Sequence, residues 1–270
     1  ACINWYDVPI KPYPFLVYNL YDCIFRYCVP VFLMISGFLF LNPKREVTVR
    51  KLYSRNIRRL LTAFFFWSFL YAVITSGFAT QRTINAEIAK NFVHNLFYGH
   101  YHMWYLYVML GMYLVTPALR AVAADRKAMR YFLVISFLLS YVLPTLQIIP
   151  AVYLSAQFTN RIDIKMIAGY SFYYLMGYYI GSEEFDRKRA VKWYLAALAG
   201  FVITFASTAG MCLWEQYPDI RMHEYLTAGV CLFSCGVFVL FKRKFENVDP
   251  QSRWMRVVSY LSSISFGVYL

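Results

Sequence analysis

The sequence predicts an all-α protein, a polytopic transmembrane helical bundle, and three observations support this prediction. Of the 270 residues, 60% are hydrophobic and only 15% are charged, whereas a soluble domain usually carries roughly a quarter charged residues. The apolar residues form long runs without the alternation of a membrane β-barrel, which favours helices. The positive charges lie mainly in the connections between these runs.

The connection 43–61, PKREVTVRKLYSRNIRRLL, orients the predicted bundle. It joins apolar runs at 29–41 and 60–79 and carries seven Lys or Arg residues against one acid, Glu46. Under the positive-inside rule such a connection is cytoplasmic. It therefore places Arg55, Arg58 and Arg59 at the inner mouth of the bundle, where an anionic cytosolic ligand could bind.

About eight spans follow from the apolar runs, and the charges agree with their order. Connections assigned to the inner side hold 20 of the 27 Lys and Arg residues, outer segments hold six, and Arg26 lies within the first span. This alternation supports the orientation more strongly than any single boundary. The predicted spans cover residues 23–41, 60–79, 103–122, 131–150, 166–182, 193–214 and 224–241, and an eighth begins at 257.

The prolines and one amphipathic stretch predict the segments outside the spans. Prolines within residues 1–22 predict an extracytoplasmic loop, because proline interrupts helices. Residues 84–97 place apolar side chains at helical spacing, which predicts a helix lying on the outer surface. Pro144 predicts a kink or a re-entrant point in the fourth span.

Both ends of the sequence suggest that residues 1–270 are a fragment of one membrane domain. The orientation puts Ala1 outside, so a cytoplasmic start would require another span upstream. Leu270 ends inside an apolar run that is too short to cross a membrane. We therefore expect the first span to be missing and the last to be truncated.

The net charge of +13 does not indicate nucleic-acid binding. Membrane topology alone explains the cations, and the sequence has no aromatic and basic stacking surface of the kind that single-strand binders show. The cysteines are expected to be small buried residues, because no His or acid joins Cys231 and Cys235 at metal-ligand spacing. No metal site is predicted.

Four side chains are candidates for chemistry. Arg26 is costly at membrane depth, by about 2.5–3.5 kcal/mol, and it either snorkels to the outer interface or faces a polar cavity. Arg55 and Arg58 form an Arg-x-x-Arg pair on one helical face, which suits bidentate phosphate capture, although topology also explains it. His102 precedes an apolar run, where it could act as a base or simply cap the span.

Small residues indicate close helix packing. Gly177 and Gly181 form a Gly-x-x-x-Gly pair in GYYIG, and Gly37 follows Ser36 in MISGFL. Such residues allow two helix backbones to approach each other. We interpret both as packing surfaces.

Several segments, taken in order, resemble acyltransferase family 3 membrane proteins. VPVFLMISGFLFL resembles that family's second span, and SRNIRRLLTAFFFW resembles the Arg-x-x-Arg segment that leads into its third. HMWYLYVMLGMYLVTPALR is similar to a His-Leu-Trp-Phe-Leu-Tyr stretch of a large subgroup. YSFYYLMGYYIG and SISFGVYL also match in kind and order. The resemblance runs from about Tyr21 to Leu270.

The resemblance implies an acyltransferase of the class that transfers groups other than aminoacyl groups, and an O-acetylating one in particular. It implies transfer of an acyl group, often acetyl, from cytoplasmic acyl-CoA to a hydroxyl of an extracytoplasmic glycan or lipid-linked sugar, by a protein of the inner membrane. Arg55 and Arg58 would bind the donor, and the catalytic His would lie upstream of Ala1. We expect His102 and Arg26 to position the acceptor or to stabilise charge.

Two other classes remain open. A transporter of a small anionic or sugar-like solute would favour paired ionisable residues at mid-span and broken helices in matched halves. Arg26 and Pro144 give that interpretation slight support, but the sequence shows neither an intramembrane acid partner nor halves. A non-enzymatic membrane domain, such as a sensor, is the third possibility. The oligomeric state is not indicated.

Overall fold

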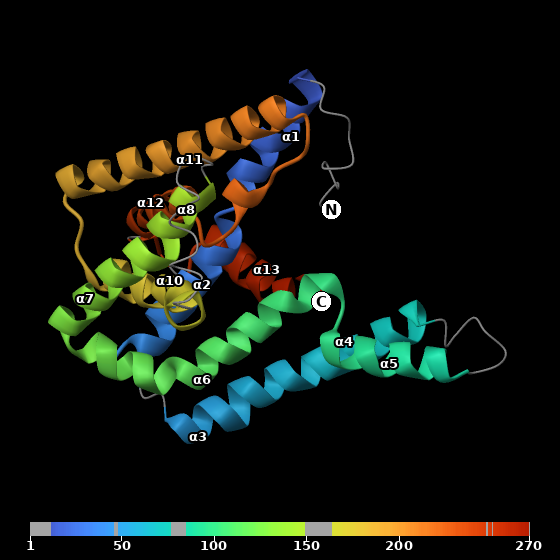
Figure 1. Ribbon diagram of the computed structural model, residues 1–270. Helices are drawn as coiled ribbons and strands as arrows, with labels where there is room; N and C mark the ends of the chain where they lie inside the picture. Colours follow the sequence, from blue (N-terminus) through green and yellow to red (C-terminus); the bar gives the residue numbers. More distant parts are fainter. Residues whose placement is uncertain are drawn as a thin grey trace. The chain divides into compact units, whose positions relative to one another are not determined.

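The computed structural model describes residues 12–45, 48–76, 85–148, 164–246, 248–249 and 251–269, and their regular secondary structure is entirely helical (Figure 1). The predicted all-α polytopic bundle is confirmed. Six helical runs in this part of the chain are long and apolar enough to cross a membrane. They are Pro14–Leu41, Val49–Thr75, Ala86–Ala124, Arg126–Ile148, Arg187–Glu215 and Arg221–Phe245.

The chain forms two compact units. The first unit comprises Ala1–Arg45 and Ala118–Glu246, and the second comprises Glu46–Pro117 and Asn247–Leu270. Helix α6 (Trp104–Ala124) contains Pro117 and contributes residues to both units. That residues 1–270 form a single membrane domain stays a prediction.

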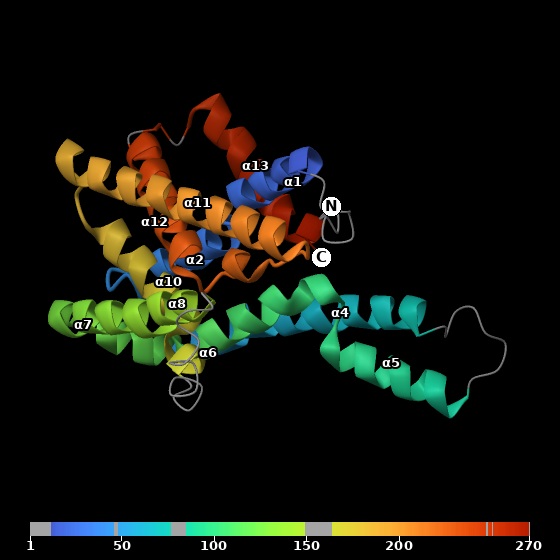
Figure 2. The ribbon, with the colours of Figure 1, turned by 45° about the horizontal axis from the view of Figure 1, so that its top comes forward.

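In the first unit, α11 packs along both α1 and α12, and α2 packs against α10 and α12 (Figures 1 and 2). Its helices are α1 (Pro12–Phe25), α2 (Cys28–Leu41), α7 (Arg126–Phe137), the π-helix η4 (Leu138–Val142), α8 (Leu143–Ile148), α10 (Ile164–Ser182), α11 (Arg187–Glu215), the 3-10 helix η6 (Arg221–His223) and α12 (Ala228–Phe245).

Helix α1 corrects the prediction of a loop up to residue 22. The helix begins at Pro12 and includes Pro14 in its first turn, where a proline costs no intrahelical hydrogen bond. The helix stops after Phe25, and α2 starts anew at Cys28 with Pro30 in its own first turn. The prolines therefore mark helix starts, and the predicted first span at 23–41 consists of two helices.

The predicted packing surfaces lie where α2 and α10 cross. A Cβ atom on Gly37 would overlap the backbone of Tyr174, and one on Gly177 would overlap the backbone of Met34. A Cβ atom on Gly181 would overlap the ring of Phe38. The two helix backbones are thus in direct contact, as the glycine spacing predicts.

Arg120, a cation that the charge pattern assigns to the inner side, closes the C-terminal end of α2. Its guanidinium donates to the carbonyl oxygens of Phe40 at 2.6 Å, Asn42 at 3.3 Å and Arg45 at 3.3 Å. The last carbonyl groups of a helix lack intrahelical partners and carry partial negative charge. The side chain therefore satisfies acceptors that the helix itself leaves open.

We expect Arg120→Ala to lower the free energy of unfolding by about 2–3 kcal/mol, since it removes charge-assisted hydrogen bonds to three carbonyls. Lys127→Ala is the control, because that side chain is exposed. Thermal unfolding of both variants in detergent measures the difference. Equal melting temperatures would contradict the capping role.

In the second unit, the basic connection continues directly into the membrane helix, as predicted. Helix α3 (Val49–Lys51), the π-helix η2 (Leu52–Ile57) and α4 (Arg58–Thr75) follow one another without a break. Thr48 caps this helical run by accepting from the amide of Lys51. The arginines thus lie on the cationic end of a long helix.

The amphipathic stretch forms α5 (Ala86–Tyr98), and its predicted helical structure is confirmed. Asn85 caps the helix, because its Oδ1 accepts from the Ile88 amide at 2.9 Å. The apolar face packs on α4, with Ile88 buried and the rings of Phe69 and Phe92 5.9 Å apart. The unit also contains the 3-10 helix η3 (Tyr101–Met103) and α13 (Arg253–Tyr269).

The irregularity expected near Pro144 is a π-helical turn. The helix that starts as α7 widens into η4 immediately before Pro144. A proline ring clashes with the carbonyl four residues earlier, here that of Ser140, and wider winding displaces this carbonyl. The irregularity near Pro144 therefore does not interrupt the helical run from Arg126 to Ile148.

Candidate functional site

A buried ionic network lies where α1 ends, in the first unit. The Arg26 Nη2 atom lies 2.8 Å from Asp22 Oδ2, and the two side chains are only 18% and 22% exposed. The Arg26 guanidinium also lies over the Tyr225 ring, 5.6 Å from its centroid. Arg26 is therefore held by an acid and an aromatic face, in place of snorkelling freely.

His223 joins the same acid from the connection between α11 and α12. Its Nδ1 atom lies 2.9 Å from Asp22 Oδ2, and its side chain is 1% exposed. Its Nε2 atom lies 2.9 Å from Asn19 Oδ1, and the Asn19 amide nitrogen donates to the Phe205 carbonyl at 3.1 Å. The amide oxygen can only accept, so Nε2 carries a proton and donates it.

The connection that carries His223 contains an ion pair between Asp219 and Arg221. Arg221 donates from its Nε atom to both Asp219 carboxylate oxygens, at 3.0 and 2.9 Å. Burial raises the pKa of Asp219, but the hydrogen bonds and charge of Arg221 outweigh it, so the pKa lies below its usual value. A lowered pKa contributes stability that is lost only as the pH falls through it. The ion pair therefore holds at neutral pH.

Sequence reasoning missed Asp22 and His223. The proline pattern predicts an outer loop at Asp22, and the sequence alone indicates no acid partner for Arg26. The available signal was spacing: Asn19, Asp22, Cys23 and Arg26 follow the i, i+3, i+4, i+7 pattern of one helix face. His223 has no such signal, because it is about two hundred positions away.

We expect Asp22→Asn to lower the free energy of unfolding by about 3–5 kcal/mol, because it leaves the buried positive charge of Arg26 uncompensated. Glu184→Gln, at an exposed position of the same unit, is the control. The double variant Asp22→Asn/His223→Gln should recover part of the loss if the two side chains interact. Additive losses in thermal unfolding would contradict that interaction.

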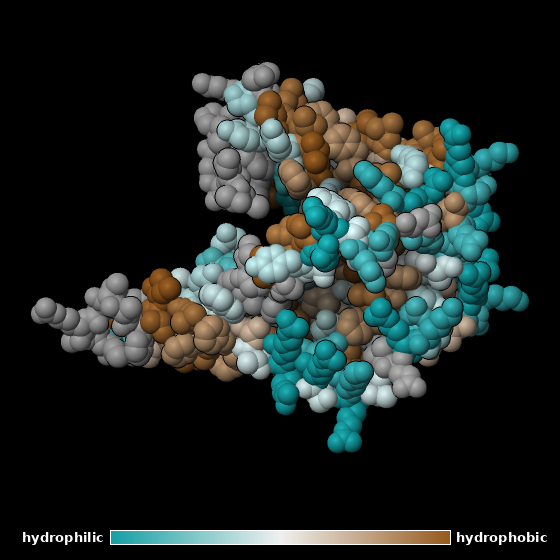
Figure 3. Space-filling model, turned by 180° about the vertical axis from the view of Figure 1, so that it is seen from behind, coloured by the Kyte–Doolittle hydropathy of each residue, from teal (hydrophilic) through white to brown (hydrophobic). Residues whose placement is uncertain are grey.

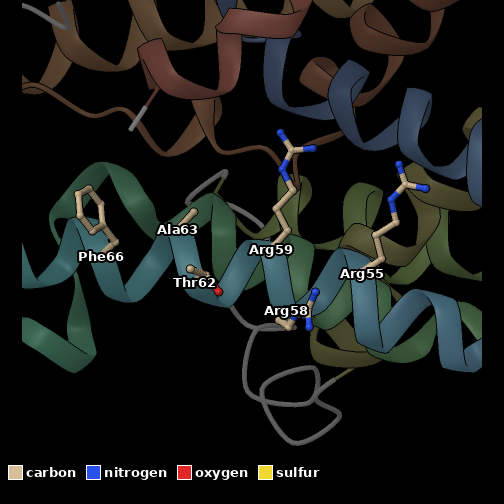
Figure 4. Close-up of a pocket in the computed structure, with 6 residues that line it drawn as sticks. All are labelled: Arg55, Arg58, Arg59, Thr62, Ala63 and Phe66. Carbon is tan, nitrogen blue, oxygen red and sulfur yellow. The ribbon is translucent and has the colours of Figure 1, made fainter.

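The second unit carries a cationic groove of about 550 Å³ (Figure 4). Arg55 comes from η2, and Arg58 and Arg59 come from the first turn of α4; all three side chains are exposed. Thr62, Ala63 and Phe66 complete its described lining, which carries three positive charges and no carboxylate. The groove therefore suits a polyanionic ligand with apolar portions.

Figure 4 refines the predicted Arg-x-x-Arg pair. Arg55 and Arg59 extend from the helix in the same direction, whereas Arg58 points elsewhere. Residues four positions apart lie closer to one side of a helix than residues three positions apart, so Arg55 and Arg59 share a side. Arg59 thus joins the two predicted residues as a third candidate.

His102 lies in η3, also in the second unit, and is half-buried. Its Nδ1 atom lies 2.7 Å from the Nδ1 atom of His100, whose ring stacks on Tyr71 with a centroid separation of 4.6 Å. Only one of these two nitrogens can carry the proton between them. Tyr71 is thirteen positions beyond Arg58 on α4, so these two residues lie about 20 Å apart along the helix axis.

The structure therefore groups Arg55 and Arg58 in one groove and places His102 beside Tyr71, near the other end of α4. It builds Arg26 into the ionic network of the first unit. These features define a polytopic membrane protein with a cationic groove. A family model described as an acyltransferase domain (Acyl_transf_3) matches residues 3–270. The chain belongs to acyltransferase family 3, as the resemblance predicted, and is a membrane acyltransferase. Searches of curated proteins and of solved structures gave no significant match.

Proposed function

We propose that this acyltransferase moves an acyl group, acetyl in particular, from cytoplasmic acyl-CoA to a hydroxyl of an extracytoplasmic glycan or lipid-linked sugar. The observation that carries the proposal is the groove with Arg55, Arg58 and Arg59 and no acid in its described lining. Coenzyme A carries several phosphates, and guanidinium groups bind phosphate in a bidentate manner. The enzyme would act in the plasma (inner) membrane.

In the proposed reaction, a base removes the proton of the acceptor hydroxyl, and the oxygen attacks the thioester carbonyl. The carbon–sulfur bond breaks, an ester forms, and the CoA thiolate leaves and takes up a proton. The base would be the catalytic histidine that the family resemblance implies. Arg55 and Arg58 hold the donor phosphates.

Arg26 and His102 are proposed to act at the acceptor side. Arg26 is pinned by Asp22 in a buried environment, so its positive charge can stabilise the developing oxyanion without reorganising. His102 shares a proton with His100, which suits a hydrogen bond to an acceptor hydroxyl. Asp22 and His223 would be positioning residues, because they act through Arg26.

The test uses the purified full-length protein in lipid nanodiscs, with acetyl-CoA labelled in the acetyl group and a panel of envelope glycans and lipid-linked sugars. We expect alkali-labile label on a hydroxyl of one acceptor class. Absence of transfer from acetyl-CoA and longer acyl-CoAs to any acceptor, with folded protein, would overturn the proposal.

One observation favours transport as a second candidate. The break between α1 and α2 lies beside the Asp22–Arg26 ion pair, and transporters use broken helices and paired charges of this kind. The family assignment favours the enzyme. Proteoliposomes separate the two, because a transporter would accumulate solute without any covalent label.

A further inference from the structure

A second cationic site lies in the first unit, away from the residues used above. It is a cleft of about 580 Å³ between α7, α10 and α11. Its charged lining residues are Arg126, Arg130, Glu183, Arg189 and Lys192. Hydrophilic side chains gather at the edge of the molecule where α7 and α11 begin (Figure 3). The sequence predicts this edge to be cytoplasmic.

The charges of this cleft are only partly balanced. Glu183 lies 3.0 Å from Arg126 and 3.6 Å from Arg189. Within the described part of the chain, Arg130 and Lys192 have no acid within ion-pair distance; the Nε atom of Arg130 donates to the Arg126 carbonyl at 3.3 Å. Four positive charges against one negative charge leave the cleft able to bind an anion.

An apolar groove of about 360 Å³ continues from the cleft, because Arg130, Tyr179 and Trp193 line both. The side chains that α7 and η4 contribute form one stripe. They are Arg130, Leu133, Val134, Phe137 and Leu138.

This stripe follows the i, i+3, i+4, i+7, i+8 pattern of a helix face, so the groove runs along the helix for about 12 Å. Val134 and Leu138 are 57% and 48% exposed, as expected for a surface that faces lipid. Phe172, Met176 and Leu232 supply part of the opposite wall. The cationic end and the apolar groove together match an amphiphile with one anionic end.

We propose that this site binds one anionic phospholipid, with its phosphate headgroup in the cleft and an acyl chain along the α7 stripe. Basic pockets between membrane helices on the cytoplasmic side attract anionic headgroups. Trp193 and Tyr179 lie at the boundary between the cleft and the groove, and such amphipathic rings favour the level of lipid headgroups. Topology requires cations on this side, but it does not require a cleft that continues into a lipid-facing stripe.

The test measures lipid retention by native mass spectrometry and the melting temperature, using phosphatidylglycerol and phosphatidylcholine with identical acyl chains. Phosphatidylglycerol should stay bound and raise the melting temperature, whereas phosphatidylcholine should do neither. Arg130→Gln/Lys192→Gln should weaken phosphatidylglycerol binding about tenfold or more. Arg187→Gln/Lys188→Gln removes the same charge from exposed positions outside the lining and should leave binding unchanged.

Two further arms test the remaining parts of the proposal. Val134→Trp fills the exposed groove without changing charge and should reduce retention while the lipid-free protein keeps its melting temperature. Millimolar inorganic phosphate and saturating acyl-CoA should not displace the lipid. The proposal is overturned by equal retention of both lipids, by an equal loss in the Arg187/Lys188 variant, or by displacement with phosphate or acyl-CoA.

Discussion

Replacing Arg55 and Arg58 together by glutamine in the full-length protein is expected to abolish acyl transfer while membrane insertion is retained. Both side chains are exposed and line the same groove, so their loss should leave the fold intact. A hydrogen bond between charged groups contributes about 1.5–3 kcal/mol. Losing two such contacts to the donor phosphates should lower kcat/KM by roughly 10²–10⁴-fold.

The matched control is Arg50→Gln/Lys51→Gln, which removes the same charge from exposed positions of the same segment outside the groove lining. A second measurement compares acyl-CoA with a donor that lacks the 3′-phosphate. The unaltered enzyme should have a lower kcat/KM with the donor that lacks this phosphate, whereas the double variant should show a smaller difference between the two donors. Unchanged transfer by the double variant would remove the donor-site proposal. Labelling that finds Arg55 and Arg58 facing outward would also remove the proposed topology.

Arg59→Gln tests whether the donor is bound by Arg55 and Arg59, which extend in the same direction, or by the Arg-x-x-Arg pair Arg55 and Arg58. If the ligand binds on the side to which Arg55 and Arg59 extend in Figure 4, this single variant should raise the KM for acyl-CoA about tenfold or more. Such a change corresponds to the loss of at least one hydrogen bond between charged groups. If only the Arg-x-x-Arg spacing matters, the KM should not change. Steady-state kinetics with varied acyl-CoA decides.

Gly177→Leu is expected to abolish accumulation of the folded protein. The added side chain would have to occupy the position of the Met34 backbone, and neither backbone can rotate out of the way. Separating α2 from α10 would also expose the side chains packed at their crossing. Overpacking of this kind costs about 3–5 kcal/mol, a large part of the stability of a typical protein.

Gly210→Ala and Gly111→Ala are the controls, because an added Cβ at either position meets no other atom within 4 Å. Alanine also favours helix over glycine by about 1 kcal/mol. Size-exclusion chromatography of detergent extracts and melting temperatures should show wild-type behaviour for both controls and aggregation for Gly177→Leu. A monodisperse Gly177→Leu protein with an unchanged melting temperature would show that the helices can separate.

Hydrophobic periodicity and charge predicted several helices correctly, whereas proline was misleading because it is compatible with both a loop and the first turn of a helix. The apolar period of residues 84–97 correctly predicted α5, and the basic connection correctly led into α4. The prolines near residue 12 predict a loop because proline interrupts helices, but a proline in the first turn is compatible with a helix. The same residue type therefore indicated a loop where the chain begins α1.

The polar contacts of the first unit show the limit of sequence reasoning more clearly. The sequence indicates that Arg26 is a costly charge, but it predicts a loop at its partner Asp22. His223 comes from about two hundred positions later in the chain. The charge pattern explains Arg120 by membrane topology alone, yet its side chain donates to the carbonyl groups at the end of α2. No periodicity within one segment encodes either contact.

By itself, the sequence determined the helical membrane class, the family and the location of the positive charges, because hydropathy and short motifs are properties of contiguous residues. Only the tertiary structure decided that Asp22 bridges Arg26 and His223, and that Arg120 closes the end of α2. The physical reason is that such contacts depend on backbone winding and on packing between distant segments. The distance between two side chains can change by a few ångströms without any change in the hydropathy pattern. A difference of a few ångströms decides whether two charged groups form an ion pair.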